Sequence, residues 1–161
     1  MMDLVKRLLG KSSKGPSETG GQDSEHNIRV AVCALFVEMA RIDGTFSKQE
    51  LDTLITILEN RYSLSPEHAQ ALITAADEEL EESVDLWQFA RLINEHYAID
   101  EKIEVIEILW RIVYVDGKMD AHEHYLMNKL SNLLRLSHNQ LIDAKLKVLH
   151  NNRHGRNELL R

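Results

Sequence analysis

The sequence holds only one cysteine, two prolines and seven glycines among 161 residues. The cysteine, Cys33, lies in the apolar run VAVCALFVEMA without a second thiol to bond, so a disulfide framework is excluded and a reducing compartment is favoured. So few glycines and prolines supply little material for the tight turns of a sheet-rich domain. The many Leu, Ile, Ala and Glu residues instead predict long helices and an all-α fold.

Long apolar runs are also missing. None approaches the ~20 residues that span a bilayer, and the start MMDLVKRLLG carries no signal-peptide cleavage pattern. We therefore expect a cytoplasmic protein. Leu4, Val5, Leu8 and Leu9 can share one face of two helical turns, and only this leader suggests any membrane association.

Basic residues are the minority, and the formal net charge is −7. The charge is uneven, because residues 1–25 are balanced and residues 151–161 carry three arginines against one glutamate. The body between them is therefore strongly acidic. Its field repels nucleic acid and attracts cations or basic partners, so we expect a protein partner and no nucleic acid.

Composition divides the chain into three parts. Residues 1–25 combine the short amphipathic leader with GKSSKGPSETGGQDSE, a stretch typical of a flexible linker. Residues 26–150 have the apolar periodicity of a helical domain, and residues 151–161 have the composition of a frayed basic tail. One compact domain with a flexible tether is predicted.

Two segments are apolar nearly all the way round a helix, as a helix at the centre of a bundle must be. They are IRVAVCALFVEMARI and IEVIEILWRIVYV, and the helices predicted beside them carry one-sided apolar stripes. A bridging helix, LWQFARLINEHY, follows Asp85 as its cap. Seven helices result, two of them central.

The two central segments belong to an internal repeat. A shift of 73 residues superposes ARIDGTFSKQE on VYVDGKMDAHE, with Asp43 on Asp116 and Glu50 on Glu123. The shared frame is D-G-x5-E. We predict an internally duplicated bundle with a pseudo-twofold axis.

Helix starts in the two halves carry matching caps. Ser47 and Asp120 each stand three residues before a glutamate, which is the spacing of a capping box. Ser65, followed by a proline, and Ser137 repeat the device one helix later. Each Asp-Gly turn is thus expected to end one helix shortly before the next begins.

The paired I-D-G and V-D-G turns, each followed by an acidic helix start, and the segment SVDLWQFARLINEHY between them resemble the tellurite-resistance TerB family over residues 28–149. The resemblance implies a seven-helix, pseudo-twofold domain found with tellurite-resistance and stress-response proteins. Related domains occur in some J-domain co-chaperones, but no HPD signature is present here. A non-catalytic interaction domain is implied.

The family also suggests cation binding, for which Ca²⁺ or Mg²⁺ needs several converging carboxylate oxygens. The candidates are Asp43, Glu50, Asp116 and Glu123, which would meet if the pseudo-twofold axis passes near both turns. The alternative is that they serve only as turn and capping residues. An EF-hand does not fit the spacing. Zn²⁺ is disfavoured, because the two histidines of the H-E-H stretch beside the second turn point to different helix faces.

Motifs of catalysis are not found: the sequence has no G-x-S-x-G elbow, glycine-rich phosphate loop or paired-cysteine zinc site. We therefore expect no enzyme. The alternative is a metal-dependent hydrolase that uses the paired carboxylates, because carboxylate clusters also hold two-metal sites.

One pair of charges interrupts the two apolar helices at equivalent positions of the repeat. Glu38 and Arg111 carry opposite charge, and we expect them to form a structural ion pair if the central helices pack across the axis. Glu107, one turn before Arg111, is the competing partner. Removing one member of a buried pair costs about 3 to 5 kcal/mol.

Overall fold

The computed structural model of the protein describes residues 17–42, 47–83, 85–116 and 121–159, apart from the side chains of residues 17–23, 116 and 152–159. Its elements are α2 (Ser17–Ala40), α3 (Lys48–Tyr62), α4 (Pro66–Glu82), α5 (Trp87–His96), α6 (Ile99–Val113), the 3-10 turn η1 (Tyr114–Asp116), α7 (Ala121–Leu133) and α8 (His138–Leu159). These ranges contain seven α-helices and no strand, which confirms the predicted all-α, seven-helix class.

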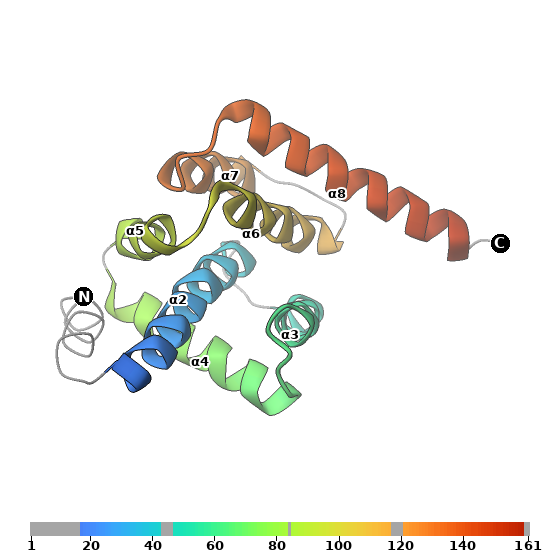
Figure 1. The fold of residues 1–161 in the computed structure, drawn as a ribbon. Helices are drawn as coiled ribbons and strands as arrows, with labels where there is room; N and C mark the ends of the chain where they lie inside the picture. Colours follow the sequence, from blue (N-terminus) through green and yellow to red (C-terminus); the bar gives the residue numbers. More distant parts are fainter. Residues whose placement is uncertain (1–16, 43–46, 84, 117–120, 160–161) are drawn as a thin grey trace.

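Helices α2 and α6 are the two central helices, as their composition predicts (Figure 1). From Val30 to Ala40 every residue of α2 is buried except the half-buried Glu38. Helices α4 and α5 pack on α2, whereas α7 and α8 pack on α6. The indole of Trp110 on α6 donates a hydrogen bond to the carbonyl of Leu141 on α8 at 3.0 Å, so this buried side chain both fills the core and ties two helices together.

The helical body extends beyond both of its predicted ends. Helix α2 begins at Ser17, inside the expected linker, and α8 continues to Leu159, through the expected frayed tail. Extending a helix that already exists requires no new nucleation step, so polar residues can prolong one beyond the core. In the part of the chain that the structure describes, no helix is both long and apolar enough to cross a membrane.

The three predicted serine caps are formed, whereas α5 begins at Trp87 with Leu86 as its N-cap, and the predicted cap Asp85 accepts from the Trp87 amide at 2.9 Å. Ser47 and Ser65 each accept a hydrogen bond from the backbone amide three residues ahead, at 3.0 and 3.2 Å. Ser137 and Gln140 form a complete capping box, with the amide of each bonded to the side chain of the other at 2.8 and 3.1 Å. The remaining predicted cap, Asp120, lies outside the described residues.

Helices α3 and α7 end in the same way, on a residue with positive φ that is not glycine. Ser63 has φ 54° and Arg135 has φ 61°. In each turn the next amide donates to a carbonyl five residues back, at 3.2 Å after Ser63 and 2.9 Å after Arg135. This is the hydrogen bond of a Schellman motif. The two turns are built alike, as a duplication would require, although the duplication itself stays a prediction.

A buried lysine of α6 joins that helix to α5 and to the end of α7. Lys102 of α6 donates from Nζ to Asn94 Oδ1 of α5 at 3.1 Å and to the Leu134 carbonyl at the end of α7 at 2.9 Å. Asn94 in turn donates to the Leu133 carbonyl at 2.8 Å. Burial, and then the nearby charge of Arg135, holds the pKa of Lys102 below its usual value.

Candidate functional site

The structure describes only some of the four predicted cation ligands. Asp43 lies outside the described residues, and Asp116 closes η1 with its side chain undescribed. Glu50 and Glu123 stand in the first turns of α3 and α7, and both are half-buried. Each of these two glutamates takes part in an interaction within the fold, so neither is a free carboxylate.

A contact between α3 and η1 brings parts of the two predicted turns together. The side-chain amide of Gln49, in the first turn of α3, donates to the carbonyl of Val115 at 3.5 Å. Gln49 directly precedes Glu50, and Val115 directly precedes Asp116. The chain segment that carries Glu50 therefore lies against the segment that carries Asp116, rather than at the opposite end of the domain.

A cation site is not formed by the described side chains alone, since they include no group of three or more His, Cys, Asp or Glu placed to hold a metal ion. The side chains of Asp43 and Asp116 are not among those described, so the four-carboxylate site stays a prediction. The histidines beside the second turn, His122 and His124, are both exposed.

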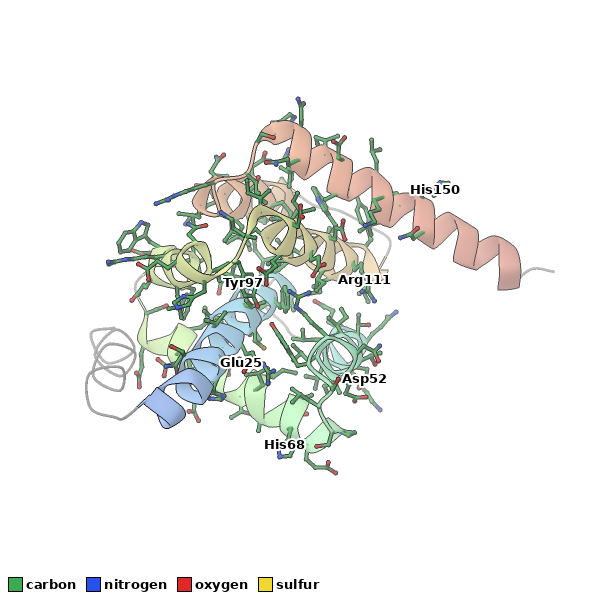
Figure 2. All side chains as sticks on the ribbon, viewed as in Figure 1. Glu25, Asp52, His68, Tyr97, Arg111 and His150 are labelled. Carbon is green, nitrogen blue, oxygen red and sulfur yellow. The ribbon has the colours of Figure 1, made fainter. Side chains whose placement is uncertain are left out.

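The predicted ion pair between Glu38 and Arg111 does not match the described side chains. Arg111 is exposed, near the C-terminal end of α6 (Figure 2), while Glu38 is half-buried on α2. Among the salt bridges of the described residues none joins these two, and Glu107, the expected competitor, pairs with Lys147 of α8 at 3.1 Å. A charged group that reaches water from α6 needs no buried partner, which removes the physical reason for the pair.

A hollow lies between α3 and α8, over α6. It has a volume of about 770 Å³, and we call it the α3–α8 cleft. Apolar side chains from each helix line it, namely Ile57, Ile108 and Val148, together with charged ones from the same helices. This volume lies within the ~300 to 1,000 Å³ of small-ligand sites, but the mixed-charge lining is unlike their mostly apolar walls.

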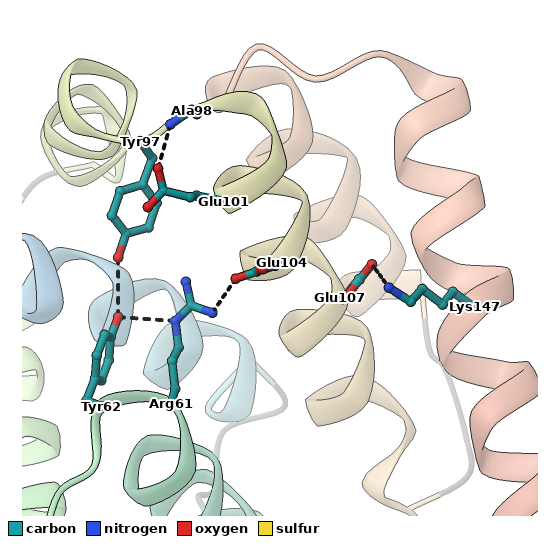
Figure 3. A network of polar contacts seen from close by, with 8 residues as sticks. All are labelled: Arg61, Tyr62, Tyr97, Ala98, Glu101, Glu104, Glu107 and Lys147. Atoms are coloured by element: carbon teal, nitrogen blue, oxygen red, sulfur yellow. Dashed lines mark hydrogen bonds and ion pairs between the residues drawn. The ribbon is translucent and has the colours of Figure 1, made fainter.

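Ion pairs fasten both walls of the α3–α8 cleft to its floor (Figure 3). Arg61 of α3 binds Glu104 of α6 at 3.0 Å, and Lys147 of α8 binds Glu107 of α6 at 3.1 Å. Arg61 and Glu104 also line a second hollow of about 330 Å³ beside α2, so one ion pair separates the two spaces.

Two tyrosines extend this network toward α5. Arg61 Nε donates to the Tyr62 hydroxyl at 3.4 Å, and that hydroxyl lies 3.4 Å from the hydroxyl of Tyr97. Burial, followed by the hydrogen bond to Tyr97, raises the pKa of Tyr62. Burial alone would lower the pKa of Arg61, but its contacts with Tyr62 and Glu104 raise it. Both side chains thus keep their protons near neutral pH, and the network suits a structural or binding role better than proton transfer.

This network was not predicted from the sequence, although the sequence contains one signal for it. Glu104, Glu107 and Arg111 follow each other at spacings of three and four residues, which places them on one face of a helix otherwise treated as apolar all round. That charged face is the floor of the α3–α8 cleft. The aromatic pair Tyr62 and Tyr97 could not be found in this way, because the two residues are far apart in sequence.

Comparison with models of protein families matches residues 29–146 to the family described as tellurite resistance protein TerB. The matched range includes both Asp-Gly turns and every described helix, apart from the first part of α2 and the last part of α8. Neither the curated proteins nor the solved structures gave a match.

Proposed function

Since the chain belongs to the TerB family and is therefore a tellurite-resistance-associated domain, we propose that it acts as a non-catalytic stress-response interaction domain in the cytoplasm. In this proposal it binds a protein partner and holds one divalent cation at its two acidic turns. The acidic charge of the whole chain favours cations over nucleic acid at such a site.

The contact of Gln49 with Val115 is the observation that carries the cation proposal. A shared site requires that both turns lie close enough for carboxylates of each to reach one ion at about 2.4 Å. The contact supports such a site, because Glu50 and Asp116 are the immediate chain neighbours of the two contacting residues. Asp43 and Glu123 would complete the ligand set from the other side of each turn.

The choice of ion follows from the donor atoms. All four proposed ligands are carboxylates, which suit the hard cations Ca²⁺ and Mg²⁺. Zn²⁺ prefers nitrogen and sulfur ligands. Here the one cysteine, Cys33, is buried in α2, away from the turns in the sequence, and the nearby His122 and His124 are exposed. Ca²⁺ or Mg²⁺ is therefore the expected ion.

Calorimetric titration of the full chain with Ca²⁺, Mg²⁺, Mn²⁺ and Zn²⁺, combined with melting curves, tests the site. A ligand that binds only the folded chain stabilises it by about 2.7 kcal/mol at one hundred times its Kd, so Ca²⁺ or Mg²⁺ should raise the melting temperature. The double variant Asp43→Asn/Asp116→Asn should keep its helical circular dichroism and lose that rise.

The matched control removes the same charge elsewhere, through Asp52→Asn together with Asp143→Asn, two exposed positions on α3 and α8. It should retain the cation effect. If wild type binds none of the four ions, the carboxylates serve only as turn and capping residues. If the Asp43/Asp116 variant keeps the full rise, the ion binds elsewhere.

A further inference from the structure

A groove with an exposed tryptophan lies between α5 and the end of α7, away from both acidic turns in the sequence. It has a volume of about 330 Å³, and we call it the α5–α7 groove. Its main lining residues are Trp87, Arg91, Asn94 and Glu95 of α5 with Leu133 and Arg135 at the end of α7. Trp87 is 55% exposed, which is unusual for the side chain with the largest apolar surface.

The groove presents the side chains that dominate protein interfaces. Arg91 places its guanidinium 5.4 Å from the Trp87 ring centre and donates from Nε to Glu95 at 3.1 Å, so the arginine is held between a ring and a carboxylate. Tryptophan and arginine are enriched among residues whose loss weakens binding most. The guanidinium of Arg135 has no hydrogen bond or ion pair with the side chains that the structure describes, and the residue is exposed.

Both walls of the groove are fixed before any partner arrives. The buried Lys102 bonds to Asn94 on the α5 wall and to the Leu134 carbonyl beside the α7 wall. Asn94 spans the two walls through its bond to the Leu133 carbonyl. A site whose parts are already held in place loses little conformational entropy on binding, which favours affinity.

The charge of the groove is opposite to that of the whole chain. Two arginines and one glutamate line it, and the glutamate already accepts from Arg91, whereas the chain as a whole carries −7. The larger α3–α8 cleft likewise has one arginine, Arg111, outside its two ion pairs, but no aromatic side chain lines it. We propose that the α5–α7 groove docks an acidic segment of a partner protein, with a carboxylate on Arg135 and a neighbouring apolar side chain on Trp87. A guanidinium fork and a carboxylate match in geometry, and the ring offers a flat apolar contact.

This inference rests on the proposed interaction role but not on the cation. The test uses phage-displayed random dodecapeptides panned on the full chain, followed by fluorescence anisotropy of the enriched peptides. The enriched sequences should share an acidic residue beside an aromatic or aliphatic one. Trp87→Ala and Arg135→Gln should each weaken binding about tenfold or more, as expected for central interface residues.

Matched controls lie outside the groove on the same molecule. Tyr125→Ala removes another exposed aromatic side chain, 70% exposed on α7, and Lys129→Gln removes another exposed positive charge from that helix. Both should leave the Kd within about twofold of wild type. Unchanged melting temperatures would show that all four variants fold.

Two results would overturn the groove proposal alone, and a third would count against the interaction role as well. Acidic peptides that bind Trp87→Ala or Arg135→Gln as tightly as wild type would place their site elsewhere. If the enriched peptides share basic residues, they bind acidic parts of the chain and not the α5–α7 groove. That result would refute the groove proposal but would still support the interaction role. Absence of any enriched peptide would count against both proposals, but the cation titration would still stand on its own.

Discussion

Replacing Lys102 by methionine tests the polar contact that joins α5, α6 and α7. Methionine keeps the length and apolar stem of the side chain, so the substitution removes the ammonium group and little packing. Lys102 is only 7% exposed, and its Nζ serves the Asn94 Oδ1 and Leu134 carbonyl acceptors. In the variant both acceptors lose their donor at a place that water reaches poorly.

The expected magnitude is a difference between two opposing effects. Hydrogen bonds that involve a charged group stabilise by about 1.5 to 3 kcal/mol each, which gives about 3 to 6 kcal/mol for two. Burial of the ammonium group opposes this, as the depressed pKa of Lys102 indicates. We therefore expect Lys102→Met to lower the free energy of unfolding by about 2 to 4 kcal/mol.

Urea denaturation followed by circular dichroism measures this loss, with Lys129→Met on the exposed side of α7 as the control that should change stability by less than about 0.5 kcal/mol. The pH dependence has a defined sign. Because the folded chain holds the Lys102 proton less tightly than the unfolded chain, stability should rise as pH climbs from the folded pKa toward the ordinary value of 10.5. The methionine variant should lack that rise. A variant as stable as wild type at neutral pH would refute the reasoning, since the two hydrogen bonds would then only offset desolvation.

Three further outcomes are expected. Ser137→Ala should cost about 1 kcal/mol in urea denaturation through loss of the α8 cap, and an unchanged midpoint would mean that the cap adds nothing. Arg111→Met should change the free energy of unfolding by less than about 0.5 kcal/mol, because the residue is exposed. A loss near 3 kcal/mol that disappears when Glu38→Gln is already present would instead support the predicted ion pair. Cys33 is buried and burial raises the pKa of its thiol, so Ellman's reagent should label it only as fast as the chain unfolds, and rapid native labelling would contradict its placement in the core.

The helices were predictable because their signals are local. Apolar residues on all faces of two segments predict burial on all sides, and α2 and α6 are central for that reason. Ser47, Ser65 and Ser137 predict helix starts because a cap depends on atoms within one turn. The outer ends of α2 and α8 were missed, since polar composition gives no reason for a helix to stop once the core has nucleated it.

The contacts between helices were less predictable, because they depend on how the helices cross. The repeat suggested that Glu38 and Arg111 meet, but equivalence in sequence does not fix which face of α6 turns toward α2. Arg111 lies instead on the face that floors the α3–α8 cleft. Tyr62 and Tyr97 meet only because α3 ends where α5 ends, and no local pattern carries that information.

The turns at Ser63 and Arg135 have a consequence for how this sequence can change. A side chain in the left-handed conformation costs about 1 to 2 kcal/mol relative to glycine, and the greater freedom of an unfolded glycine returns only part of that difference. Ser63→Gly and Arg135→Gly should thus each stabilise the fold, by up to about 1 kcal/mol in urea denaturation. Ser63→Gly would not affect the α5–α7 groove, because Ser63 does not line it. At Arg135 the same step would remove a guanidinium from that groove, so selection for stability and selection for docking would favour different residues there, whereas only selection for stability would act at Ser63.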